Sequence, residues 1–360
     1  MRETDLHKPI LIFLGFVSST YSRSAILLSH KSSKYVKEFY EAPTKSFSAL
    51  RLVIRLKKIH KNRKVIFVIM SPCHKLTLPT RLIARKNVIL DAGWPLSDGE
   101  LSRSFRWQSF FSIPKTVLID LIAFHSASLV LTETEKQKYR IARLFRVSHK
   151  RLFVSYTGFN ESLVLKQTID EVFLTKIRKQ VETLDNKVVI IFRGKINNES
   201  GYSRIIQVAK ILETQATFLL LVNQNPWTGL TPRNCIEINT FSDEQMFSCY
   251  RISQIALGQI SNHNRLELTI PHKAFEAAYF GKTYLTNRSA GMEEFGNEEQ
   301  LAFLNSLNPE KVAQQIIEIS IPATVEFYGR NLKAQYNFRY SQEVLNRNFE
   351  NVLDFFTRCR

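Results

Sequence analysis

Short apolar runs separated by longer segments with helical spacing form the first 160 residues of the chain. The runs are nearly continuous rather than alternating, which is typical of strands buried on both faces of a parallel sheet. We predict strands at Ile10–Leu14, Lys64–Ile69, Asn87–Leu90, Ser128–Thr132 and Arg151–Val154. Helices are predicted between them, at Ser48–Ile59, Val117–Phe124 and Glu133–Phe145.

The same pattern starts again after residue 160. Further strands are predicted at Lys187–Phe192, Thr217–Val222, Cys235–Ile238, Ile255–Leu257 and Lys282–Thr286. The helices of this half are predicted at Ile169–Leu184, Ser203–Glu213, Asp243–Tyr250, Pro271–Phe280, Pro309–Ile317 and Ser341–Phe356. We therefore expect an α/β protein with two Rossmann-like, doubly wound domains that face a central cleft. The boundaries expected from the pattern are 1–157 and 158–340.

Charge separates the two halves. The net charge is +18, and residues 1–156 hold 28 Lys and Arg against 10 Asp and Glu, whereas the remainder is neutral. The cations cluster at Arg51–Lys64, Arg81–Lys86 and Lys136–Arg151. The Arg51–Lys64 helix suits an anionic membrane surface, and it equally suits a core-packed helix with a solvated basic face. The positive charge would also suit a nucleic-acid-binding protein, but no recognised motif supports a specific nucleic acid partner.

Composition indicates the cellular compartment of the protein and which metal or disulfide sites it lacks. The four cysteines lie far apart, so neither a disulfide framework nor a zinc site is expected. The apolar run at Ile10–Val17 is too short to span a membrane and is better explained as a buried strand than as a signal peptide. We expect a cytoplasmic protein, either free or held at the inner face of the cell membrane, without a metal or cofactor.

The segment Ile270–Glu294 carries the clearest candidate chemistry. Pro271 suits a helix start and Gly281 suits its end, and Lys273 and Glu276 share one face between them. An ammonium group can meet a diphosphate, and a carboxylate can accept from ribose hydroxyls. The alternative is an ordinary surface ion pair, which is common and contributes little.

This segment resembles the P-x-K-x-x-E-A-x-x-x-G-K signature of the group 1, family 4-like GT-B glycosyltransferases. Three weaker stretches follow the same order as in that family. They are FRGK at 192–195 with ESG at 199–201, ASLVLTET at 127–134 with VSYTG at 154–158, and NTFSDEQ at 239–245. The resemblance covers about residues 85–320 and is strongest over 187–300.

The resemblance implies a hexosyltransferase-type enzyme that moves a sugar from a nucleotide diphosphate sugar to an acceptor hydroxyl. The donor would bind the second domain, and a glycan or lipid-linked acceptor would bind the first, onto which the C-terminal helix 341–360 packs back. Glu276 would hold the ribose, and Lys195 and Lys273 would neutralise the departing diphosphate. Gly194 and the backbone of Ser289, Ala290 and Gly291 would complete the nucleotide site. The family also suggests surface polysaccharide or glycolipid synthesis.

Two positions depart from the family's pattern. Ser200 stands where the family has a lysine, and Leu268 stands where it has a first glutamate, with Glu267 one place away. A catalytically inactive GT-B scaffold is therefore an alternative. No Asp-x-Asp motif occurs, which fits a metal-independent GT-B enzyme. Asp91, at the end of a predicted strand, is the candidate base for the acceptor hydroxyl, or else an aspartate that caps a turn.

Overall fold

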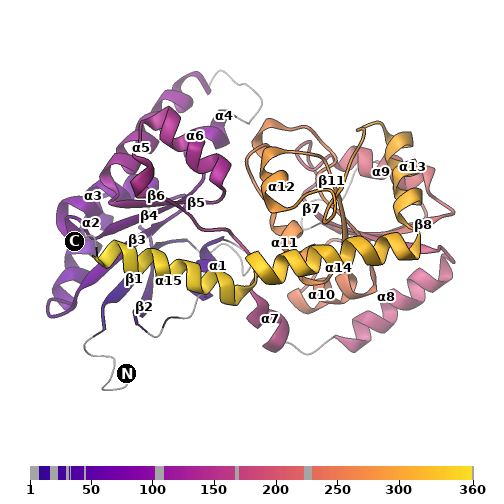
Figure 1. Ribbon diagram of the computed structural model, residues 1–360, viewed down its shortest axis with the longest axis horizontal. Helices are drawn as coiled ribbons and strands as arrows, with labels where there is room; N and C mark the ends of the chain where they lie inside the picture. The colour runs from indigo at the N-terminus through magenta and orange to yellow at the C-terminus, as the bar shows by residue number, and fades with distance from the viewer. Residues whose placement is uncertain are drawn as a thin grey trace. The chain divides into compact units, whose positions relative to one another are not determined.

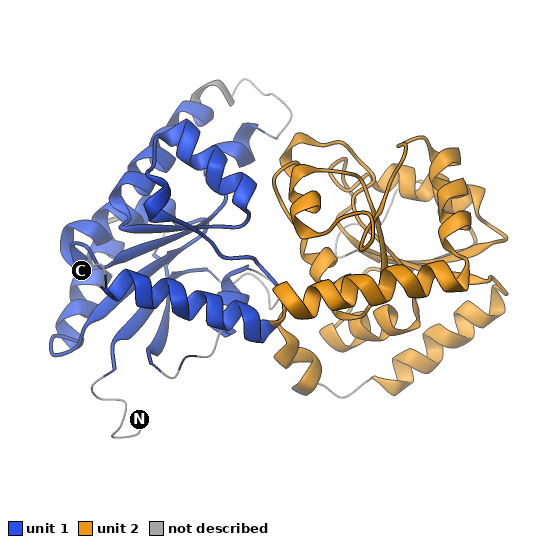
Figure 2. Ribbon diagram, in the orientation of Figure 1, with its two compact units in different colours: residues 1–158, 342–360 blue, residues 159–341 orange. Residues whose placement is uncertain are grey.

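The computed structural model describes residues 8–16, 23–29, 32, 34–43, 46–101, 109–166, 170–222 and 229–358. It divides into two compact units, one of Met1–Gly158 with Gln342–Arg360 and one of Phe159–Ser341 (Figure 2). The last helix of the chain thus belongs with the first unit. Within these ranges, no helix has both the length and the apolar character needed to cross a membrane.

The first unit contains a six-stranded parallel sheet in the order β2-β1-β3-β4-β5-β6 (Figure 1). Its strands are β1 (Ile10–Gly15), β2 (Val36–Glu41), β3 (Val65–Met70), β4 (Val88–Gly93), β5 (Leu129–Thr132) and β6 (Leu152–Val154). Successive residues point to opposite faces, so Ile10 and Ile12 pack in one core cluster and Leu11 and Phe13 in another. This explains the continuous apolar runs of the sequence, because both faces of the sheet are covered.

Different helices cover the two faces of this sheet. One core cluster contains residues of α2 (Ser46–Ile59), α3 (Thr77–Ala84), α5 (Ser109–Ser126) and α6 (Glu135–Phe145). The other contains residues of α1 (Arg23–Ser29) and α15 (Gln342–Arg358). In α15, the side chains of Phe349, Val352, Leu353 and Phe356 all join that cluster. A short helix, α4 (Leu96–Leu101), follows β4.

The second unit contains another six-stranded parallel sheet, in the order β12-β11-β10-β7-β8-β9. Its strands are β7 (Val188–Gly194), β8 (Ala216–Val222), β9 (Cys235–Ile238), β10 (Ile255–Leu257), β11 (Thr283–Thr286) and β12 (Ala302–Phe303). Its helices are α7 (Glu161–Lys166), α8 (Glu171–Thr183), α9 (Tyr202–Ile211), α10 (Asp243–Ile252), α11 (His272–Tyr279), α12 (Ala290–Phe295), α13 (Pro309–Ile319) and α14 (Pro322–Arg339). The sequence order of the strands reverses between β7 and β10. Rossmann sheets bind ligands next to such a reversal point, at the carboxyl ends of the strands.

The predicted α/β fold with two doubly wound sheets is confirmed, and the facing cleft stays a prediction. All ten predicted strands are present, with ends shifted by at most three residues. The edge strand β2 was not predicted, because it is only partly buried and mixes charged with aromatic residues. The two-residue strand β12 was not predicted either. The helices that were not predicted are α1, α3, α4, α7, α12 and α14, and in α14 the exposed Phe327 and Phe338 obscure a narrow buried stripe.

Candidate functional site

The helix α11 turns its two charged residues inward. The helix begins after Pro271, whose backbone is extended, and the chain leaves it through Gly281 at φ +61°. Lys273 is 6% exposed and Glu276 is 1% exposed. These values exclude the surface ion pair that was the alternative interpretation of the two residues, because such a pair requires solvated side chains.

Arg193 and Tyr250 hold the buried Glu276 carboxylate. Arg193 lies near the carboxyl end of β7, and its Nε donates to Glu276 Oε2 at 2.7 Å while its Nη2 donates to Oε1. The Tyr250 hydroxyl donates to Oε2 at 2.8 Å. Such a bidentate contact offsets the cost of burying the carboxylate and fixes its orientation. Glu276 is therefore held at the reversal point of the sheet by strand β7 and helix α10.

Lys273 reaches the neighbouring strand end. Its Nζ donates to the carbonyl of Gly258, directly after β10, at 2.7 Å, and lies 4.3 Å from the centroid of the Phe192 ring. Burial, assisted by the nearby Arg193 charge, lowers the pKa of Lys273 well below its usual value. Position 258 requires glycine, because a Cβ there would lie 2.3 Å from Thr286 Oγ1.

The residues predicted to meet the diphosphate lie along the same sheet edge. Gly194 ends β7, and the side chain of Lys195 that follows it is exposed. Ser289 caps α12, with its hydroxyl accepting from the Met292 amide at 3.2 Å. The carboxyl ends of parallel strands share one edge, so the structure brings Gly194, Lys195, Lys273 and Ser289 to one side of the second unit.

Glu267, which was not among the predicted site residues, accepts from the two backbone amides expected to bind phosphate. The Ala290 amide donates to Glu267 Oε1 at 3.2 Å, and the Gly291 amide donates to the Glu267 carbonyl at 2.8 Å. The carboxylate thus lies at the start of α12, where the helix dipole favours negative charge. In this structure, both amides already have acceptors.

A small polar cavity adjoins Glu267. Its volume is about 130 Å³, and it lies beyond the carboxyl ends of β10 and β11. Its polar lining comes from Gln259, Ser261, Asn262, His263, Glu267, Thr269, Thr286, Asn287, Arg288 and Ser289. Gln259 Oε1 is buried and has no hydrogen-bond partner among the described residues. Hydroxyl, amide and imidazole groups of this kind suit a small ligand that can both donate and accept hydrogen bonds.

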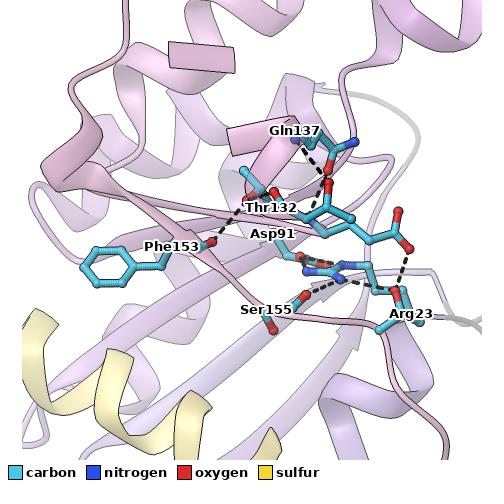
Figure 3. Close-up of polar contacts among 9 residues, drawn as sticks. Arg23, Asp91, Thr132, Gln137, Phe153 and Ser155 are labelled. Atoms are coloured by element: carbon cyan, nitrogen blue, oxygen red, sulfur yellow. Dashed lines mark hydrogen bonds and ion pairs between the residues drawn. The ribbon is translucent and has the colours of Figure 1, made fainter. Parts of the chain in front are cut away.

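Asp91, the predicted base, lies in the first unit and is buried at the end of β4. Arg23 Nε and Nη2 donate to its Oδ1 at 2.8 and 2.7 Å (Figure 3). Arg23 Nη1 also donates to the Ser155 carbonyl at 2.5 Å. A base must reach the proton that it removes, so this role would require Asp91 to become accessible. Its assignment stays a prediction.

The arginine partners of the two buried carboxylates were not among the predicted site residues. Arg193 had a usable signal, because it is a cation at the end of a predicted buried strand. Arg23 had none, since 68 residues separate it from Asp91 and no spacing rule connects them. Only the folding of the sheet brings the members of such pairs together.

The described residues contain no group of three His, Cys, Asp or Glu side chains placed to hold a metal ion. Cys73 and His74, which are adjacent in the sequence, are both buried. Burial raises the pKa of the Cys73 thiol to about 11 and lowers that of the His74 imidazole to about 4.

The fold is that of the GT-B glycosyltransferases. The chain is similar to Anabaena Alr3699/HepE, solved in complexes with UDP and glucose and with UDP-glucose, at 13% identity and a TM-score of 0.66, over 96% of this chain and 99% of that one. It is also similar to a glycosyltransferase from Rickettsia africae, at 11% identity and a TM-score of 0.64, over 97% and 99%. A UDP-forming α,α-trehalose-phosphate synthase from Burkholderia xenovorans matches at 9% identity and a TM-score of 0.66, over 96% and 98%. No family model and no curated protein matches the sequence.

Proposed function

We propose that the protein is a glycosyltransferase that moves a sugar from a nucleoside diphosphate sugar to an acceptor hydroxyl. The acceptor oxygen would form the new bond to the anomeric carbon as the bond to the diphosphate breaks. The nucleoside diphosphate would leave with the electron pair, and the acceptor proton would pass to a base. Uridine is the first nucleoside to test, because HepE was solved in complex with UDP and with UDP-glucose, and the trehalose-phosphate synthase is described as UDP-forming.

The observation that carries this proposal is the buried group of Arg193, Lys273 and Glu276 at the reversal point of a Rossmann sheet. Burying ionisable side chains of this kind is costly, and such groups are often retained because they bind a ligand. The position is also the one where doubly wound sheets bind nucleotides.

Each residue would have a distinct task in this reaction. Glu276, oriented by Arg193, would accept from the ribose hydroxyls, and the exposed Lys195 would approach the diphosphate. A diphosphate near Lys273 would raise the depressed pKa of this side chain again, so the ammonium would gain its charge where the leaving group needs it. These cations support our proposal that the donor needs no metal ion.

The first unit would bind the acceptor, with Asp91 as the candidate base. The proposal extends to a glycan or lipid-linked acceptor, surface polysaccharide or glycolipid synthesis, and a cytoplasmic location at an anionic membrane face. Its support is the positive charge of this half and four exposed apolar side chains of α5, namely Val117, Leu118, Leu121 and Ile122.

An inactive scaffold is the second candidate. It is favoured by the contacts of Glu267, whose carboxylate and carbonyl accept from the two amides predicted to bind phosphate. Under that proposal, the buried Arg193–Glu276 pair serves only folding, and no nucleotide would bind.

The thermal unfolding midpoint measured with nucleoside diphosphates and their sugars, without metal, separates the two candidates. A ligand that binds only the folded protein raises the midpoint. We expect one nucleotide to raise it selectively, and Lys195→Ala and Glu276→Gln to weaken the effect. Lys210→Ala is the matched control, because Lys210 is an exposed lysine near the end of α9, at the opposite edge of the same sheet.

A selective rise that Lys195→Ala weakens and Lys210→Ala preserves, together with release of the nucleoside diphosphate when an acceptor is added, would establish transfer. If no nucleotide raises the midpoint of the wild type, the transferase proposal fails. Binding without turnover against a panel of glycan acceptors would favour the scaffold.

A further inference from the structure

A second concave site lies in the first unit, at the amino ends of β3 and β4. It has a volume of about 920 Å³, within the range of small-molecule sites. Its walls come from the end of α2 and the turn at 60–64, the end of α3, and the residues 85–87 that precede β4. Asp91 lies at the carboxyl end of β4, so this cavity is at the opposite edge of the sheet from the predicted base.

The lining of this cavity is cationic. Seven of its residues are lysine or arginine, and none of the described residues that line it is acidic. The seven are Lys57, Lys61, Arg63, Lys64, Arg81, Arg85 and Lys86. Two basic clusters that are separate in the sequence, Arg51–Lys64 and Arg81–Lys86, therefore meet around one hollow. The cavity also contains His60, whose Nε2 lies 3.1 Å from Glu38 Oε2.

Local structure accounts for three of the seven cations. Lys57 Nζ donates to the Ile83 carbonyl at 2.6 Å, and Arg81 Nη1 donates to the Arg85 carbonyl at 2.8 Å, so both satisfy carbonyls at the end of α3. Arg63 donates to the Lys8 carbonyl at 3.0 and 2.6 Å. The hydrogen bonds of these three side chains stabilise the walls of the cavity.

The other four cations have no such explanation. Lys61, Lys64, Arg85 and Lys86 are exposed, and their side chains make no hydrogen bond or ion pair with the described residues. The ends of α2 and α3 both lie here, but two helix C-termini supply only about one negative charge between them. The repulsion among these cations is therefore largely uncompensated within the described chain, and a bound polyanion would relieve it.

We propose that this cavity is a binding site for a multiply phosphorylated ligand. The phosphates would belong either to a free molecule or to the headgroup of an anionic lipid, since both present the same chemistry to Lys61, Lys64 and Lys86. The site is independent of the proposed donor site, because it involves different residues of the other unit.

The test is calorimetric titration with tripolyphosphate. The variant Lys61→Gln/Lys64→Gln/Lys86→Gln removes three exposed charges from the cavity. The matched control, Lys176→Gln/Arg178→Gln/Lys179→Gln, removes three exposed charges from α8 in the second unit. We expect one-to-one binding by the wild type, a loss of about tenfold or more in the cavity variant, and little change in the control. Thermal midpoints no lower than that of the wild type would show that the variants are folded.

Binding to vesicles of phosphatidylcholine, with and without cardiolipin, whose headgroup carries two phosphates, distinguishes the two sources. If the cavity variant loses cardiolipin-dependent binding and tripolyphosphate competes with the vesicles, the ligand is a lipid headgroup. If only tripolyphosphate binding falls, the ligand is a free molecule. The proposal is overturned if the cavity and control variants bind tripolyphosphate equally well, or if the cavity variant loses binding to a single-stranded RNA while its tripolyphosphate affinity is unchanged.

Discussion

Arg193 and Glu276 form a buried ion pair whose two members differ in exposure. The Arg193 side chain is 21% exposed, whereas that of Glu276 is 1% exposed. The arginine can therefore recover some hydration when its partner is removed, but the carboxylate cannot. Removing Arg193 should therefore lower the free energy of unfolding more than removing Glu276, because it leaves an uncompensated charge that is fully buried.

Arg193→Ala should lower the free energy of unfolding by about 3–5 kcal/mol, because Glu276 would retain its charge with the Tyr250 hydroxyl as the remaining donor. Chemical denaturation measures the change. Adding Glu276→Gln should recover part of the loss, since a neutral amide is cheaper to bury. If the double variant is no more stable than the single one, this account of the pair is wrong. Arg265→Ala is the control, because the Arg265–Glu199 pair is partly exposed and should contribute less than about 1 kcal/mol.

His74 should make stability depend on pH. Burial lowers its pKa to about 4, from an ordinary value of 6.5. Between these values the unfolded chain binds a proton that the folded chain does not, so the contribution of His74 is complete above pH 6.5 and is lost as the pH falls towards 4. The whole effect should be about 3 kcal/mol. Denaturation across this range should give a flatter dependence for His74→Phe. A parallel dependence in that variant would contradict the prediction.

At the scale of elements, α15 completes the core of the unit where the chain begins. The face of the sheet that carries Leu11, Phe13, Ile66 and Val68 packs against the apolar stripe of this helix. The helix is strongly amphipathic, with its polar side in solvent, so its stability depends on that contact more than on helix propensity. Folding of the first unit should therefore require the last residues of the chain.

Leu353→Ala should destabilise the first unit by about 2–5 kcal/mol, because Leu353 is fully buried and its truncation leaves a cavity. Denaturation followed by a probe in the first unit measures the loss. Asn351→Ala, on the exposed side of the same helix, should change stability by no more than about 0.5 kcal/mol. Equal effects of the two substitutions would mean that α15 is not part of this core in solution.

At the scale of the whole molecule, each unit has a distinct electrostatic character. The excess positive charge lies in the first 156 residues, while the second half is neutral overall. The cationic cavity is in the first unit, and the buried Arg193–Glu276 group is in the second. Our two proposals accordingly assign one ligand to each unit.

Hydrogen exchange with and without UDP tests that separation. If the proposed function is correct, UDP should protect amides in residues 193–201, 258–271 and 286–292, which lie at the carboxyl edge of the second sheet. Amides that line the cationic cavity should change little, and tripolyphosphate should produce the reverse pattern. Protection by UDP confined to the cavity would contradict the assignment of the donor site.

The linear pattern of the sequence was sufficient to predict ten strands, two doubly wound sheets and the face shared by Lys273 and Glu276. These features depend on local periodicity, which each segment carries by itself. The partners of the charged residues depend on contacts across the fold. Arg193 reaches Glu276 over 83 residues, Arg23 reaches Asp91 over 68, and Glu267 holds an amide 23 residues away. Two basic clusters meet around one cavity for the same reason. Only the tertiary structure decided these pairings, because sheet topology, rather than spacing along the chain, sets which strand and helix ends become neighbours.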